Sequence, residues 1–224
     1  MPTYEELGFG RGATISRDST RTLFGQVMGL VAFTCGFAAL GAYVAKNMTG
    51  GAGIVFFLLA FGCVFGLNYA AARGREQLAM GLLFAMGLLL GMAVAPVVDY
   101  YAKANPGAVY QAAGATGLFV GALGSAGYAI RRDLSAWYRT LFWALLALIV
   151  FGLIATFATI PHANVIYAVA GLVIFGAFTV FDFNRLRTGR MMIGPVPIAA
   201  SIFLDIFNVF LFFLSLFGGG GNRR

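Results

Sequence analysis

The sequence predicts an all-α integral membrane protein in which seven helices cross the bilayer. Hydrophobic residues make up 60% of its 224 positions and charged residues only 10%, whereas roughly a quarter of an ordinary soluble domain is charged. A soluble chain of this length has too little interior to bury so much apolar surface, so much of it must face lipid. The division of the apolar residues into runs of about twenty sets the number of helices.

The apolar runs follow one another along the whole chain with short connections. Each is close to the length of about 20 residues that an α-helix needs to cross the hydrocarbon core. The predicted spans are 23–45, 52–72, 77–98, 110–130, 137–160, 163–181 and 195–217. We therefore expect a cytoplasmic N-terminal tail at 1–22, one seven-helix transmembrane domain at 23–217 and a C-terminal tail at 218–224.

Glycine pairs with a spacing of four residues occur within four of these spans. They are Gly25/Gly29, Gly62/Gly66, Gly87/Gly91 and Gly117/Gly121. Small residues at this spacing let helix backbones approach closely, where dispersion and weak hydrogen bonds replace the hydrophobic drive that is absent in lipid. We interpret the pairs as close packing within one bundle, with a dimerisation face as the alternative.

The basic residues indicate the orientation of the helices. With the N-terminus inside, the cytoplasmic side receives Arg11, Arg17, Arg21, Arg73, Arg75, Arg131, Arg132, Arg139, Arg185, Arg187 and Arg190. The other side receives Lys46, Lys103, Arg223 and Arg224. Cytoplasmic loops carry an excess of Lys and Arg, so the N-terminus and the connections near 73–76, 131–136 and 183–194 are expected to face the cytoplasm. Short tails and loops favour the plasma (inner) membrane of a bacterium over an internal eukaryotic membrane.

Several other classes of protein are disfavoured by the residues present. The net charge of +7 comes from basic clusters between apolar runs, which is a topology pattern and not a nucleic-acid site. Cys35 and Cys63 each lie inside an apolar run, which argues against a disulfide or a cysteine metal site. His162, the only histidine, lies in a predicted outer loop, and no Walker, HExxH or GxSxG motif occurs. We expect no enzyme activity, no cofactor and no nucleic-acid partner.

One acidic residue, Asp205, lies well inside an apolar run. It follows Pro195 by ten residues, which is about 15 Å along a helix and near the bilayer midplane. A carboxylate there costs about 3 kcal/mol on insertion scales, so it marks a site that faces protein or water. Ser201, Asp205, Asn208 and Ser215 share one helix face because their spacings are four, three and seven. We interpret this polar face as the lining of a pore; a buried Asp that holds two helices together is the alternative.

The remaining acidic residues lie at or beyond the ends of the spans. Asp182 ends the sixth span, while Asp99 and Asp133 fall in predicted connections. The second and sixth spans end on the cytoplasmic side, where the seventh begins, so Arg73 and Asp182 share that side with the approach to Asp205. Two carboxylates and a guanidinium there can hold a channel closed. For Arg73 alone, a topology-setting loop charge is an equally good interpretation.

With these residues in place, the chain resembles the Bax-inhibitor family, also called the transmembrane Bax inhibitor motif family. The resemblance covers nearly the whole chain, and its most specific part is the L-D-x-x-N-x-F pattern at 204–210. The ending Gly-Asn-Arg-Arg also resembles bacterial members. The matching segments are 91–101 (GMAVAPVVDYY), 132–135 (RDLS), 179–187 (TVFDFNRLR) and 201–217 (SIFLDIFNVFLFFLSLF).

The resemblance implies a fold with six helices around a central seventh and a passive, pH-sensitive Ca²⁺ leak. It implies that Asp182 and Asp205 are the proton-sensing pair and bind Ca²⁺ transiently, and that Arg73 latches the closed state, with Arg75 as the neighbouring alternative. Family members often have an arginine near the end of the last helix, where this chain has Ser215.

The sequence therefore leads to two functional hypotheses. The first is a pH-sensitive calcium-leak channel gated by a proton-sharing aspartate pair, with Ser201 and Asn208 on the pore-lining face and with membrane lipid, Ca²⁺ and protons as partners. The second is a non-conducting membrane regulator that binds a membrane protease or another membrane protein. Some bacterial relatives that lack the aspartates are linked to protease regulation, so the presence of both acids favours the leak.

Overall fold

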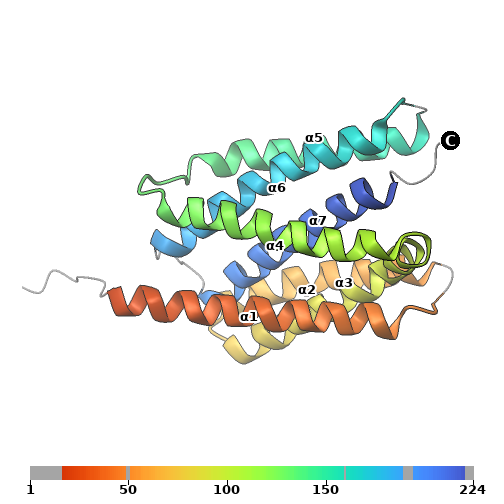
Figure 1. Ribbon diagram of the computed structural model, residues 1–224. Helices are drawn as coiled ribbons and strands as arrows, with labels where there is room; N and C mark the ends of the chain where they lie inside the picture. The colour runs from red at the N-terminus through yellow and green to blue at the C-terminus, as the bar shows by residue number, and fades with distance from the viewer. Residues whose placement is uncertain (1–16, 49–50, 159, 189–193, 220–224) are drawn as a thin grey trace, which may run out of the picture.

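The computed structural model describes residues 17–48, 51–158, 160–188 and 194–219, and all regular structure within these ranges is helical. Seven helices run alternately in opposite directions along one bundle (Figure 1), as short connections require. They are α1 (Arg17–Val44), α2 (Ala52–Ala72), α3 (Glu76–Ala104), α4 (Pro106–Ala129), α5 (Trp137–Phe157), α6 (Ala163–Thr188) and α7 (Pro195–Gly219). The predicted all-α class with seven helices is confirmed.

Two helices extend well beyond their apolar runs. Helix α3 continues to Ala104, so Asp99 is helical and not in a connection, and its carboxylate pairs with Lys103 Nζ at 2.6 Å. Helix α6 continues to Thr188 and carries Arg185 in its last turn, where a positive charge complements the helix dipole. Hydropathy marks only the part of a helix that lies in lipid, so it placed both helix ends too early.

Both termini of the helical domain also differ slightly from the prediction. Helix α1 begins at Arg17, inside the predicted N-terminal tail, and α7 ends at Gly219. The rest of the two predicted tails lies outside the described residues, as do 189–193 of the arginine-rich connection.

Six of the helices in the described chain are long and apolar enough to cross a membrane, and α4 is not among them. Its 24 residues span about 36 Å, so its length is sufficient and its mean hydropathy is what falls short. The reason is composition: glycine and alanine fill much of α4, and these small residues contribute little to hydropathy.

Helix α7 lies between two groups of helices, α1–α3 and α4–α6 (Figure 1). It contacts α1, α2, α3, α4 and α6, whereas α5 packs against α6 alone. Every residue of α7 before Gly219 is buried or half-buried. The arrangement of six helices around the seventh is therefore not confirmed, because α5 lies outside the contact shell of α7.

Of the four predicted glycine pairs, only Gly87/Gly91 packs fully against another helix. A Cβ on Gly91 would collide with the backbone of Ala38, and one on Gly87 with Thr34, so these glycines allow α3 and α1 to touch. Gly117 and Gly121 of α4 face open space instead. The same holds for Gly25 and Gly29 of α1. The interpretation as packing sites was therefore wrong for these two pairs, because the spacing alone does not say whether another helix is opposite.

Candidate functional site

The two aspartates singled out by the sequence lie on neighbouring, antiparallel helices. Asp182 precedes the end of α6 by six residues, and Ser201 follows the beginning of α7 by six residues. Both are therefore about 9 Å from the same end of the bundle. Asp205 lies one helical turn deeper on α7. The ends of α2 and α6 and the beginning of α7 gather at this end (Figure 1).

Both carboxyl groups are enclosed by protein. Asp182 is 1% exposed and Asp205 4% exposed. The hydroxyl of Ser201 donates a hydrogen bond to Oδ2 of Asp182, which ties α7 directly to α6. The two aspartates also act on each other electrostatically. The structure therefore brings Asp182, Asp205 and Ser201 into one cluster between the two helices.

The carboxyl group of Asp205 is the less satisfied of the two. Its Oδ2 is buried and has no hydrogen-bond partner among the described residues. The Thr179 hydroxyl is within hydrogen-bonding reach of this carboxyl, but it donates to the carbonyl oxygen of Phe175 at 2.8 Å. A hydroxyl has a single proton to donate, so one acceptor position on Asp205 remains open.

The positive charge that acts on Asp182 comes from its own helix. Arg185 follows it by three residues on α6 and attracts its carboxylate. Arg73, the predicted latch, ends α2, is exposed, and lies over the Tyr69 ring with 4.8 Å between the guanidinium carbon and the ring centroid. Within the described residues, Arg73 forms no ion pair with either aspartate. The spacing of three residues on one helix predicts the attraction between Arg185 and Asp182, which the positions of the loop arginines do not.

Asn208 and Ser215 complete the predicted polar face of α7 beside Ser201 and Asp205. Asn208 is half-buried, and its side-chain amide donates to the carbonyl oxygen of Leu204 in the preceding turn at 2.7 Å. Ser215 is also half-buried. Ser201 is thus the member of this face that joins Asp182, whereas Asn208 bonds within its own helix.

Asn184 is a residue near the site that sequence reasoning missed. It is 2% exposed, and its amide donates to the carbonyl oxygens of Ile130 at 2.8 Å and Arg132 at 3.1 Å. Its side-chain oxygen accepts a long hydrogen bond of 3.4 Å from the Leu134 backbone. One side chain of α6, two residues from Asp182, therefore holds the connection between α4 and α5. The matching segments 132–135 and 179–187 meet here, which neither segment predicts alone.

Few side-chain oxygens near Asp182 and Asp205 can bind a cation. In the described part of the chain, no group of three or more His, Cys, Asp or Glu side chains is placed to hold a metal ion. Two carboxyl groups and the hydroxyls of Ser201 and Thr179 are the side-chain oxygens of the cluster. Ca²⁺ in resident protein sites takes six to eight oxygen ligands, so water must supply most of the shell of any Ca²⁺ that passes here.

A bundle of apolar helices with two carboxyl groups enclosed between two of them defines the class: a multi-pass helical membrane protein with a buried acidic pair. Residues 20–223 match the family described as inhibitor of apoptosis-promoting Bax1, and the chain belongs to this family. The family resemblance noted in four segments of the sequence is confirmed.

Bacterial proteins are similar to this chain over most of its length. A protein of Helicobacter pylori is 31% identical over 165 residues, which are 73% of this chain and 70% of the relative. One of Deinococcus radiodurans is 27% identical over 221 residues, which are 92% of this chain and 93% of the relative. A Streptococcus pyogenes protein named an uncharacterized membrane protein is 25% identical over 175 residues, which are 75% and 73% of the two chains.

Proposed function

We propose that this protein is a pH-sensitive calcium-leak channel, which passes Ca²⁺ passively across the plasma (inner) membrane of a bacterium. The observation that carries the proposal is the pair Asp182 and Asp205, the two buried charged residues of the described chain, enclosed between α6 and α7. Carboxyl groups inside a membrane are costly and are by default functional. Packing alone does not require two of them side by side with one oxygen unpaired.

The pair supplies a proton-dependent contact between the two helices. Two carboxylates in a low-dielectric setting cannot both ionise cheaply, so they share one proton and titrate as a unit. The charged groups that act on this unit are the two aspartates and Arg185. Raising the pH removes the shared proton and leaves two negative charges facing each other, so α6 and α7 separate and a path opens. Lowering the pH restores the proton and closes the path.

The same oxygens suit a passing Ca²⁺ ion. Ca²⁺ is a hard cation that prefers carboxylate and hydroxyl oxygens. Once ionised, Asp182 and Asp205 attract it, and Ser201 adds a neutral oxygen. Because most of the ligands are water, the ion is held weakly and leaves again, as conduction requires.

Two arginines can act on the charge of the pair. Arg73 has the role that the family resemblance implies, but its guanidinium lies over Tyr69. Arg185 acts on Asp182 from the same helix, so it favours ionisation of the pair and does not itself hold α6 to α7. We propose that Arg185 sets the pH at which the pair loses its proton and that Arg73 holds the closed state when it leaves Tyr69. We expect no enzyme activity and no resident cofactor.

The test is Ca²⁺ flux into sealed liposomes that contain only this protein and a Ca²⁺-sensitive dye. We expect flux that rises from mildly acidic to mildly alkaline pH and that is lost in Asp205→Asn. Asp99→Asn is the matched control, because it removes a carboxylate that pairs with the exposed Lys103 outside the cluster. A well-folded protein without flux at any pH would overturn the channel and favour the non-conducting membrane regulator.

A further inference from the structure

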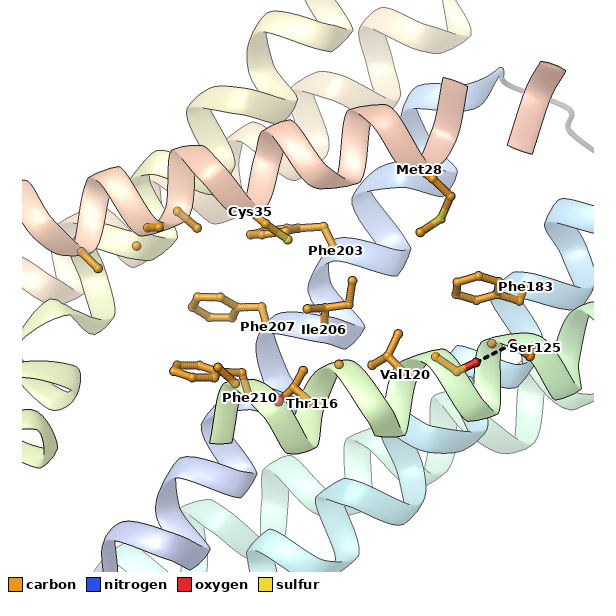
Figure 2. Close-up of a pocket in the computed structure, with 18 of the residues that line it drawn as sticks. Met28, Cys35, Thr116, Val120, Ser125, Phe183, Phe203, Ile206, Phe207 and Phe210 are labelled. Atoms are coloured by element: carbon orange, nitrogen blue, oxygen red, sulfur yellow. Dashed lines mark hydrogen bonds between the residues drawn. The ribbon is translucent and has the colours of Figure 1, made fainter. Parts of the chain in front are cut away.

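A large apolar groove lies between α1 and α4 and is floored by α7 (Figure 2). Its volume is about 1080 Å³. The backbones of α1 and α4 stay apart. The rings of Phe24 and Tyr128 meet across the Arg21 end of the groove, with 5.4 Å between their centroids, and beyond this contact the groove is open. Phe203, Phe207 and Phe210 of α7 lie in this space in Figure 2, and neither Asp182 nor Asp205 lines it.

The open side of the groove is formed by small residues of α4. Gly117 and Gly121 are exposed, and a Cβ added to either would meet no atom within 4 Å. Gly114 on the same helix also faces open space but does not line the groove. The groove is therefore a recess in the lateral surface of the bundle, which a membrane would fill with something apolar.

Two hydroxyl groups in the groove wall are already hydrogen-bonded. The Thr116 hydroxyl donates to the carbonyl oxygen of Ala112 at 2.7 Å, and the Ser125 hydroxyl to that of Gly121 at 2.7 Å. The other polar side chains of the wall are Arg21, Cys35 and Tyr128, so most of the wall is apolar. A hydrated Ca²⁺ ion finds no carboxylate here, which separates the groove from the aspartate cluster.

A single charged residue lies at one end of the groove. Among the lining residues of the described chain, Arg21 alone carries a charge, and it is exposed at the beginning of α1. From there the groove follows α1 to Ala42, a distance of about 32 Å that matches the hydrocarbon core of about 30 Å. In the proposed orientation, Arg21 lies at the cytoplasmic leaflet, where anionic lipids attract basic residues.

We propose that the groove binds an anionic phospholipid, with its phosphate paired to Arg21 and its acyl chains against the phenylalanines of α7. An anionic phospholipid is negatively charged at one end and apolar along its acyl chains. The groove wall is complementary to it, with the positive Arg21 at one end and mostly apolar side chains along its length. The groove also exceeds the 300 to about 1,000 Å³ typical of small-molecule pockets. A guanidinium recognises phosphate oxygens in a bidentate manner, which favours a phosphate-bearing lipid over a partner helix.

The test uses the full chain in nanodiscs of phosphatidylcholine that contain a small fraction of phosphatidylglycerol with a photoactivatable acyl chain. We expect cross-links to Met28, Cys35 and Phe207, and about fivefold more of them than with photoactivatable phosphatidylcholine. Arg21→Ala should remove this preference, whereas Arg139→Ala, an exposed arginine outside the groove, should keep it. Equal labelling by the two lipids in the wild type would overturn the proposed headgroup site.

A second pair of variants tests the groove itself. Gly121→Leu fills it, and Gly114→Leu adds the same side chain to the same helix outside it. We expect Gly121→Leu to lose most cross-links at Cys35 and Phe207 and Gly114→Leu to keep them, with both variants monodisperse and equally heat-stable. Unchanged labelling in Gly121→Leu, or cross-links from a second copy of the chain at these residues, would overturn the lipid site.

Discussion

Helix α7 faces two very different environments on its two sides. Towards α6 the packing is close: the ring of Phe212 lies directly over Gly171, and Ser201 bonds to Asp182. Towards α1 and α4, Phe207 and Phe210 line an open groove. A soluble protein would do the reverse, exposing its acids to water and packing its phenylalanines tightly.

The difference between the two sides of α7 follows from the lipid that surrounds the bundle in place of water. An open apolar groove costs little in a membrane because lipid chains are as apolar as the wall they meet. An exposed carboxylate costs several kcal/mol there, so it must be enclosed by protein. In this bundle, protein therefore encloses the charged residue of α7, and we propose that one side of α7 gates an ion while the other holds lipid.

The largest effect should come from Asp205→Asn, which removes a carboxylate and nearly preserves its shape. We expect Ca²⁺ flux in liposomes to fall at least about tenfold, since few other oxygens can replace the lost ligand. The heat stability in detergent should equal or exceed that of the wild type, because a costly buried charge is gone. Phe207→Ala, on the groove side of α7, should leave the flux close to the wild-type value. Equal flux in wild type and Asp205→Asn would make Asp205 structural.

Asp182→Asn tests the proton switch on the same side. The amide cannot ionise, so raising the pH no longer creates two facing negative charges. We expect flux that is nearly independent of pH, measured from mildly acidic to mildly alkaline conditions. A rise with pH as steep as in the wild type would defeat the aspartate-pair mechanism even if the protein conducts Ca²⁺.

Asn184→Ala tests whether the polar contacts near the pair hold the bundle together. It leaves the carbonyl oxygens of Ile130 and Arg132 without their side-chain donor. We expect the free energy of unfolding to fall by about 2 kcal/mol, measured by thermal unfolding in detergent. Asn164→Ala is the control, because Asn164 is an exposed residue of the same helix, and should change little. Equal stability of the two variants would contradict the bridging role.

Removal of the positive charges should have a smaller effect on the gate. Arg185→Ala removes the attraction that favours ionised Asp182, so the pair keeps its shared proton longer and we expect the rise of flux to move to higher pH. Arg73→Ala should raise the leak at acidic pH only slightly, since the guanidinium lies over Tyr69 in this structure. Flux against pH, measured in parallel for both variants, separates the two effects, and a leak that rises with Arg185→Ala at acidic pH would contradict this role of Arg185.

The orientation can be tested without any effect on function. In a chain whose Cys35 and Cys63 are replaced, Arg131→Cys and Lys46→Cys place single thiols at exposed positions on opposite ends of the bundle. We expect a membrane-impermeant reagent outside the cell to label position 46 and not position 131. The reverse pattern would invert the topology and place Arg21 at the outer leaflet.

The sequence by itself determined the class of the protein, the number and order of the helices and the position of Asp205 along the last helix. These depend on how each segment partitions between lipid and water, which is a local property. For the same reason, it also predicted that Asp182 and the beginning of α7 share one end of the bundle. Hydropathy predicted the helix ends least accurately where helices extend beyond the apolar run, as at Ala104 and Thr188.

Only the tertiary structure decided which residues meet. It paired Asp182 with Ser201, kept Arg73 away from the aspartates, and used Asn184 to hold the connection between α4 and α5. It also left Gly121 without a facing helix, whereas the same spacing at Gly91 packs tightly. Contacts between helices depend on which faces are opposed across the bundle, and the pattern along one helix does not contain the rotation and position of its neighbours.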